Sequence, residues 1–325
     1  MSAPLIYPEN VLIMAPLSGF TDLAYRRSAR RGGCRFAFTE MVDAASLAYA
    51  NGNGEVLLKR GEEEDFLAVQ LVGSDEELLK RACSKLNERD FSLLDFNLGC
   101  PVPKVVRKGA GAALGKNLDR AVKCFQAIVS ESKFVNTVKL RILDEVDPAP
   151  TLELCKALVQ SGARALTIHG RTADHFYTGS VSFSVIRAIR EAFPEIPVIA
   201  NGGVNSRETY DTIRRETGCS RVMLAQGIMG NPWLFGELSE NLPPPTLEQW
   251  KEMVRFHVSE MIGLYGETSA MRQARKIVHD YLKGRGFAAA LRAEASALST
   301  LQDLDHLLSH TTIGAVSGTI RKILI

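Results

Sequence analysis

Residues 94–101 of this chain read Leu-Asp-Phe-Asn-Leu-Gly-Cys-Pro, an apolar strand pattern that ends abruptly in a polar turn. The pattern predicts that Cys100 is presented at the carboxyl end of a strand. A free cysteine is most often a buried structural thiol, which is the alternative interpretation. Gly99 and Pro101 favour a reactive cysteine, because these residues stiffen a turn rather than fill a core.

A glycine-rich segment follows this turn in the sequence. Residues 108–114 read Lys-Gly-Ala-Gly-Ala-Ala-Leu, and Gly111 lies eleven residues after Cys100. At the entry to a helix, such a segment lets the backbone approach a ligand closely. We therefore expect Cys100 and the glycine-rich turn to share one cleft.

Short apolar runs without alternation recur along the chain, and each is followed by a polar turn and a helical pattern. Such runs suit parallel strands that are buried on both faces, and eight strand-helix repeats in about 230 residues match a TIM (β/α)8 barrel. An open doubly wound sheet is the second choice, because candidate functional residues follow most of the strands rather than one crevice. The expected strands are Val11–Pro16, Phe36–Glu40, Leu67–Leu71, Leu93–Asn97, Thr137–Arg141, Ala165–His169, Pro197–Ala200 and Arg221–Leu224.

A proline hinge at residues 242–245, Leu-Pro-Pro-Pro, ends the strand pattern. Beyond it, apolar residues recur at helical spacing and predict a small all-α domain. At 325 residues the chain is long enough for one barrel and a smaller domain. We expect the barrel over residues 1–240 and the helical domain over residues 246–325. The residues of the helical pattern are Trp250, Met253, Val254, His257, Met261, Leu264, Ile277, Tyr281 and Leu282.

Composition excludes several classes of protein. Apolar residues make up 46% of the chain, yet no apolar run is long enough to span a bilayer. The first ten residues lack the basic and apolar regions of a signal peptide, so a cytoplasmic protein is expected. The six cysteines are scattered without metal-ligand spacing, which suits a reducing compartment and predicts no metal site.

The distribution of charge is more informative than the net charge of +2. Between residues 272 and 292, six lysine or arginine residues accompany one acidic residue, Asp280. On a helix, several of them would form one stripe that suits RNA phosphates, although a solvated helix face is the usual meaning of such a run. The stripe is Arg272, Arg275, Lys276, His279 and Lys283. A second cluster after the first expected strand is Arg26, Arg27, Arg30, Arg31 and Arg35.

Polar and small residues gather at the expected strand ends, where a TIM barrel builds its active site. Taken alone, His169 reads as a structural histidine, Lys139 as an ion-pair partner and residues 201–203, Asn-Gly-Gly, as a turn. Their conjunction indicates a phosphorylated planar cofactor. Flavin mononucleotide (FMN) fits better than a dinucleotide, because no Rossmann fingerprint is present. Lys139 would then offset negative charge on the reduced flavin ring.

At this point the chain resembles the bacterial-type tRNA-dihydrouridine synthases, FMN-dependent enzymes that reduce uridine to dihydrouridine in transfer RNA. The Asn-x-Gly-Cys-Pro segment at residues 97–101, with its downstream glycines, is highly specific for this family. Other matching stretches span the barrel and the helical tail. They are Met14–Leu17, Phe20–Asp22, Val138–Arg141, His169–Thr172, Ile199–Gly202, Gly230–Trp233 and Met271–Gly284.

The resemblance implies that Cys100 is the general acid that protonates C5 of uracil, while reduced FMN gives a hydride to C6 and NADPH reduces the flavin. A thiol suits this role, because its ordinary pKa of about 8.5 keeps it protonated at neutral pH. A monomer without a metal is expected, and the spacing of the basic stripe predicts tRNA contacts from Arg272, Arg275, Lys276 and Lys283. The implied FMN contacts are Pro16, Leu17, Ser18, Gln70, Lys139, His169, Asn201, Gly202, Gly203, Ala225 and Gln226.

One departure from the family pattern follows the eighth expected strand. Family members usually have Gly-Arg where this chain has Ala225-Gln226. Replacing arginine by glutamine removes a fixed cation near the expected phosphate, so weaker FMN retention is expected.

Two rival interpretations stay open. An FMN barrel oxidoreductase that acts on a small molecule, such as a free pyrimidine, would share the flavin residues, but the basic C-terminal helices count against it. A non-catalytic RNA-binding protein that retained the barrel is the second rival. Cys100 in its intact turn counts against that one.

Overall fold

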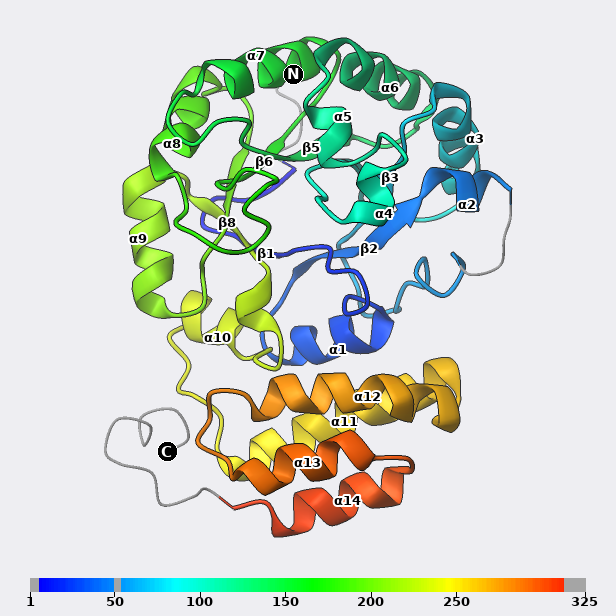
Figure 1. The fold of residues 1–325 in the computed structure, drawn as a ribbon, viewed down its shortest axis with the longest axis vertical. Helices are drawn as coiled ribbons and strands as arrows, with labels where there is room; N and C mark the ends of the chain where they lie inside the picture. Colours follow the sequence, from blue (N-terminus) through cyan, green and yellow to red (C-terminus); the bar gives the residue numbers. More distant parts are fainter. Residues whose placement is uncertain (1–5, 50–53, 313–325) are drawn as a thin grey trace. The chain divides into compact units, whose positions relative to one another are not determined.

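The structure, a computed structural model, describes residues 6–49 and 54–312. Within them, eight parallel strands follow one another around a closed barrel, which β8 completes by pairing with β1 (Figure 1). This arrangement confirms the TIM barrel expected from the sequence and excludes the open sheet. The strands are β1 (Leu12–Met14), β2 (Phe36–Asp43), β3 (Leu67–Val72), β4 (Leu93–Leu98), β5 (Asn136–Arg141), β6 (Leu166–His169), β7 (Val198–Asn201) and β8 (Arg221–Leu224).

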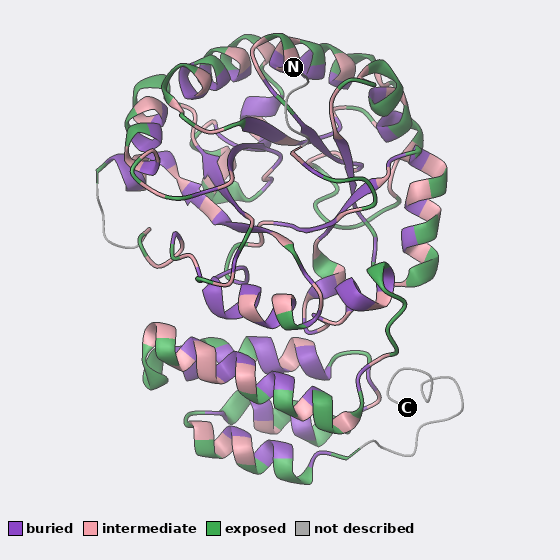
Figure 2. Ribbon diagram, turned by 180° about the vertical axis from the view of Figure 1, so that it is seen from behind, coloured by how far each residue is buried: buried purple, intermediate pink, exposed green. Residues whose placement is uncertain are grey.

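The chain forms two compact units, and the first is the barrel with its surrounding helices, whose described residues are 6–21, 35–49 and 54–225. Polar side chains start several of these helices by accepting hydrogen bonds from free backbone N–H groups, as Asp75, Asn117 and Ser206 do. Most residues of the strands and those on one side of the surrounding helices are buried (Figure 2). The helices are α2 (Ala44–Ala48), α3 (Glu76–Leu86), α4 (Pro103–Val106), α5 (Ala112–Gly115), α6 (Leu118–Glu131), α7 (Ala149–Gln160), α8 (Phe183–Ala192) and α9 (Arg207–Thr217).

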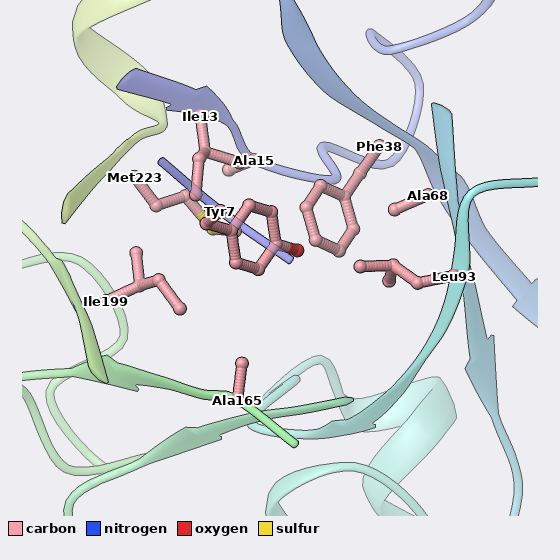
Figure 3. Packing of buried hydrophobic residues seen from close by; sticks show 9 residues of the cluster. All are labelled: Tyr7, Ile13, Ala15, Phe38, Ala68, Leu93, Ala165, Ile199 and Met223. Carbon is pink, nitrogen blue, oxygen red and sulfur yellow. The ribbon is translucent and has the colours of Figure 1, made fainter. Parts of the chain in front are cut away.

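The inside of the barrel changes from apolar to polar along the strands. An apolar cluster surrounds the ring of Tyr7 (Figure 3). Because side chains two positions apart share a face of a strand, Asp95 and Asn97 follow Leu93 on the inner face of β4. The apolar cluster therefore excludes water beneath a polar layer near the carboxyl ends of the strands. Its members are Tyr7, Ile13, Ala15, Phe38, Ala68, Leu93, Ala165, Ile199 and Met223.

The second unit, whose described residues are 22–34 and 226–312, is helical. Trp250 is fully buried and donates its indole N–H to the backbone oxygen of Tyr281 at 3.2 Å. The helical region expected after the proline hinge is confirmed as far as residue 312, and residues 313–325 lie outside the described part. The boundary at 240–246 stays a prediction. The helices are α1 (Leu23–Arg31), the 3₁₀ helix η1 (Gln226–Ile228), α10 (Leu234–Ser239), α11 (Leu247–Tyr265), α12 (Glu267–Leu282), α13 (Ala289–Ala297) and α14 (Leu301–His310).

Helix α1 packs within this unit through three arginines of the second basic cluster, Arg26, Arg27 and Arg31. Arg26 is buried, and Arg27 Nη1 lies 2.6 Å from Glu260 Oε2 of α11. The guanidinium of Arg31 lies 3.3 Å from the centroid of the Phe256 ring. These arginines are therefore committed to contacts inside the helical unit. No helix among residues 6–49 and 54–312 has the length and apolarity needed to cross a membrane.

Candidate active site

Cys100 lies two residues beyond β4, in a turn that Asn97 holds. The Oδ1 atom of Asn97 accepts hydrogen bonds from the backbone N–H groups of Gly99 and Cys100 at 3.0 and 2.9 Å. Cys100 is half-buried, whereas the other cysteines of the chain are buried. Burial raises the pKa of the Cys100 thiol above its usual value. The turn therefore presents a protonated and partly accessible thiol.

The glycine-rich segment contacts Cys100 directly. The N–H of Ala112 donates a hydrogen bond to the Cys100 carbonyl oxygen at 3.0 Å. Gly111 has a φ of +59°, and a Cβ on it would lie 2.7 Å from the same oxygen. Only glycine fits this position, so the close approach of the two turns depends on it.

A chain of buried hydrogen bonds leads from Asp95 to the Cys100 turn. Gln70 donates its amide N–H to Asp95 Oδ2 at 2.7 Å, and Asn97 donates its amide N–H to Gln70 Oε1 at 2.8 Å. Thr137 donates to Asp95 Oδ1 at 2.6 Å. Because Asp95 accepts from the amide N–H of Gln70, the Oε1 atom of Gln70 faces Asn97. Gln70 Oε1 accepts from the amide N–H of Asn97, so Asn97 Oδ1 faces the turn. Burial raises the pKa of Asp95 to about 6, although the bonds from Thr137 and Gln70 favour the ionised form.

Lys139 on β5 lies beside Asn201 on β7. The Nζ atom of Lys139 donates to Asn201 Oδ1 at 3.1 Å, and Asn201 in turn donates to the Met223 carbonyl oxygen at 2.8 Å. Burial, with the charge of Arg141 as a second cause, lowers the pKa of Lys139 to about 8. Burial and then the nearby cations, Lys139 first, lower the pKa of His169 to about 2. The site therefore combines a cationic lysine with a neutral imidazole at neutral pH.

Arg141, at the end of β5, ties the Cys100 turn to the loop after β6. Its Nε donates to the Gly99 carbonyl oxygen at 3.0 Å, and its Nη1 donates to the Thr172 carbonyl oxygen at 2.9 Å. Its guanidinium lies 5.5 Å from the centroid of the Tyr177 ring. Two loops from different strands are thus held around Cys100 by one buried side chain.

Gly202 and Gly203 follow β7 with φ values of +131° and +74°. A Cβ on Gly202 would lie 3.2 Å from the His169 ring, and one on Gly203 would lie 3.9 Å from Arg171 Nη2. Arg171 also donates its Nε–H to the Gly179 carbonyl oxygen at 3.0 Å. The glycine turn therefore has an arginine beside it, which the sequence analysis did not assign to the site.

Comparisons with known proteins identify the family of this chain. A family model described as Dihydrouridine synthase (Dus) matches residues 13–316. The chain belongs to the dihydrouridine synthase family. It is 32% identical over 302 residues to tRNA-dihydrouridine synthase B of Pseudomonas aeruginosa, with 91% of this chain and 90% of that protein covered. It is 31% identical over 306 residues to the protein of the same name from Vibrio cholerae, with 92% and 95% covered.

Most site residues inferred from the dihydrouridine synthase resemblance belong to the barrel unit. After β1, Leu17 donates its N–H to Thr21 Oγ1 at 2.9 Å, and Gly19 donates its N–H to Glu40 Oε2 at 2.6 Å. Leu17 and Ala225 pack against the apolar cluster around Tyr7. Gln226 begins η1 and belongs to the helical unit, so its position is described only within that unit. Those in the barrel unit are Pro16, Leu17, Ser18, Gln70, Cys100, Lys139, His169, Asn201, Gly202, Gly203 and Ala225.

The Gly230–Trp233 stretch, a family motif, packs inside the helical unit. A Cβ on Gly230 would lie 2.2 Å from the Asp280 backbone, so only glycine allows this approach to α12. Arg285 is buried, donates to Asn231 Oδ1 at 2.9 Å and lies 5.3 Å from the centroid of a Trp233 ring. This motif and Arg285 are therefore structural in this unit.

The basic stripe on α12 divides by exposure. Arg272, Lys276 and Lys283 are exposed. Arg275 is half-buried and donates its Nε–H to the Leu298 carbonyl oxygen at 2.8 Å. His279 Nε2 lies 2.8 Å from Ser296 Oγ. Three cations of the stripe thus face solvent, while Arg275 and His279 also contact the segment 296–298.

Proposed function

We propose that this dihydrouridine synthase reduces the C5–C6 double bond of uridine in tRNA, with FMN as its cofactor and NADPH as the reductant. The Cys100 turn carries the proposal, because it holds a protonated thiol at the mouth of the barrel. The relatives from Pseudomonas aeruginosa and Vibrio cholerae are both named tRNA-dihydrouridine synthase B, which supports tRNA as the substrate.

The residues around the barrel mouth fit FMN. Gly202 and Gly203 follow β7 at positive φ, and glycines in such a turn let a phosphate approach the backbone closely. Arg171 supplies a cation beside this turn. Lys139 supplies a buried positive charge that suits an anionic reduced flavin ring. The donor set and the glycine turn thus match a phosphorylated planar group.

Bound reduced FMN would supply a hydride to C6 of uracil. Cys100 gives its proton to C5, and its sulfur is left as a thiolate. The charges of Lys139 and Arg141 favour that thiolate, since both lower the pKa of Cys100 against the larger effect of burial. Neutral His169 can donate or accept a hydrogen bond without adding another charge to the site.

The substrate uridine lies within a folded RNA, so it has to leave its base stack to reach the barrel mouth. Extrusion of a base costs a few kcal/mol. Contacts between RNA phosphates and the exposed cations of α12, together with exposed Lys104 and Arg107 after the Cys100 turn, would offset that cost. A cytoplasmic monomer remains part of this proposal.

The deciding experiment has two parts. The purified protein should carry FMN, turn colourless with NADPH, and convert uridine to dihydrouridine in tRNA taken from cells that lack the gene. Mapping dihydrouridine in that tRNA would identify the position. Reduction of a free pyrimidine but not of tRNA would favour a small-molecule oxidoreductase. A protein that binds tRNA but cannot be loaded with FMN would contradict the catalytic proposal.

A further inference from the structure

Three side chains with metal-ligating atoms meet on the helical unit, outside the proposed active site. Glu294 lies on α13, and His306 and His310 lie one turn apart on α14. One ligand atom from each side chain lies within 4.8 Å of the others. Glu294 and His306 also line an open hollow beside the segment 297–299 and residues 302–303. The cluster is therefore accessible from solvent.

The hydrogen bonds of His310 set the direction of its free electron pair. Its Nδ1 lies 2.7 Å from the His306 carbonyl oxygen, an acceptor, so Nδ1 carries a proton. Its Nε2 lies 3.0 Å from Glu294 Oε2. Metal-bound histidines characteristically donate their other ring N–H to a backbone carbonyl in this way. Two facing acceptors, Nε2 and a carboxylate oxygen, need a proton or a metal ion between them.

His306 completes the set. No described side chain is hydrogen-bonded to its ring, which lies 4.9 Å from the His310 ring, centroid to centroid. Two imidazoles and a carboxylate are the ligands that zinc and similar divalent ions accept. Ligand atoms around a tetrahedral zinc lie about 3.3 Å apart, given bonds of about 2.0 Å. The three ligand atoms already lie within 4.8 Å of one another, so metal binding would require them to approach somewhat more closely.

We propose that Glu294, His306 and His310 bind a divalent transition-metal ion of the zinc class, which joins α13 to α14. The fourth position would face the hollow and hold water. The sequence-based expectation of no metal rested on cysteine spacing, which does not address histidines and a carboxylate on neighbouring helices. An ion that binds only the folded unit would stabilise it. The alternative is an ion pair between Glu294 and a doubly protonated His310.

The test is calorimetric titration of ZnCl₂ into the full chain after chelator treatment, in a Cys100→Ser background that removes the half-buried thiol. We expect one saturable site, at least tenfold weaker in His306→Ala or His310→Ala and lost in the double variant. Glu294→Gln keeps the side-chain size and should also weaken zinc binding. His279→Ala is the matched control, because it removes a histidine of the same unit that lies outside the cluster.

Thermal unfolding separates the metal site from the ion pair. Zinc should raise the melting temperature of the parent and of His279→Ala, and should leave that of the double variant unchanged. The ion pair alone predicts that zinc changes none of these temperatures, while His310→Ala lowers the melting temperature without metal. Absence of saturable binding, or binding that survives in the double variant, would overturn the proposal.

Discussion

The mouth of the barrel and the exposed face of α12 carry cations of the same types in opposite physical settings. Lys139 and Arg141 are held by hydrogen bonds to Asn201, Gly99 and Thr172. Arg272 on α12 and Lys283 just beyond the end of that helix face solvent. Buried groups that share hydrogen bonds act as a unit, whereas exposed charges contribute small and nearly separate amounts.

This difference in setting predicts which substitutions should have large effects on activity. A change at the barrel mouth alters a fixed geometry and should act on the chemical step or on the cofactor. A change on α12 should act on RNA binding alone and should depend on salt.

The largest effect is expected at Cys100. Cys100→Ala should lose about 100-fold or more in turnover on tRNA, because only the proton donor is removed. Flavin content and the reduction of the flavin by NADPH should persist, and stopped-flow measurement of the two half-reactions checks this. Cys155→Ala is the control, because this fully buried thiol should affect stability and not turnover. Equal loss of both half-reactions in Cys100→Ala would mean that the residue is structural.

The next effect concerns Asp95, which orients Gln70 and, through it, Asn97. Asp95→Leu leaves the Gln70 amide without its acceptor, and a broken buried hydrogen bond of this kind costs about 1–3 kcal/mol. Turnover on tRNA should fall about tenfold or more as the Cys100 turn loosens. In Asp95→Asn, an Asn oxygen can still accept from Gln70 while Thr137 Oγ1 accepts from the new amide. That variant should keep most of its turnover, and equal loss in both variants would exclude a positioning role.

Comparison of the parent with Asp95→Asn also tests the pH dependence of stability. Burial raises the pKa of Asp95 to about 6 in the folded protein, above its value of about 3.9 in an unfolded chain. The folded protein thus holds this proton more tightly, so the contribution to stability is complete below pH about 4 and is lost as pH rises through about 6. Chemical unfolding at several pH values should show this decline in the parent, and Asp95→Asn should flatten it. An unchanged pH profile would place the titration elsewhere.

The contrast also explains what the sequence could predict. Unbroken apolar runs identified the strands, since parallel strands are buried on both faces. The Cys100 turn was readable because its residues are adjacent. The contact between Asp95 and Gln70 joins residues 25 positions apart, and Arg171 lies beside Gly203, which follows another strand. Neither Asp95 nor Arg171 was therefore assigned a role. Likewise, Arg27 looks available for RNA until its partner Glu260, 233 residues away, is known.

A smaller effect is expected at the phosphate end of the proposed flavin site. The family resemblance implies an arginine at the position of Gln226, so Gln226→Arg should slow FMN dissociation. Arg171→Gln should accelerate dissociation about tenfold, because it removes the cation beside the Gly202–Gly203 turn. Fluorescence of released FMN measures both rates. Faster FMN release in Gln226→Arg, or an unchanged rate of release in Arg171→Gln, would show that another cation holds the phosphate.

The smallest effect per substituted residue is expected for the basic stripe of α12. Replacing Arg272, Lys276 and Lys283 together by glutamine should weaken tRNA binding and lower the dependence of log affinity on log salt by up to about 3, since each phosphate contact releases about one counterion. NADPH oxidation by the flavin should be unaffected. Arg27→Gln is the control, because it loses the ion pair with Glu260 and should lower stability without changing the salt slope. Binding titrations at several salt concentrations decide the matter. A triple variant with an unaltered slope would mean that α12 is only a solvated face, and the exposed Lys104 and Arg107 beyond Cys100 would then be the next residues to neutralise.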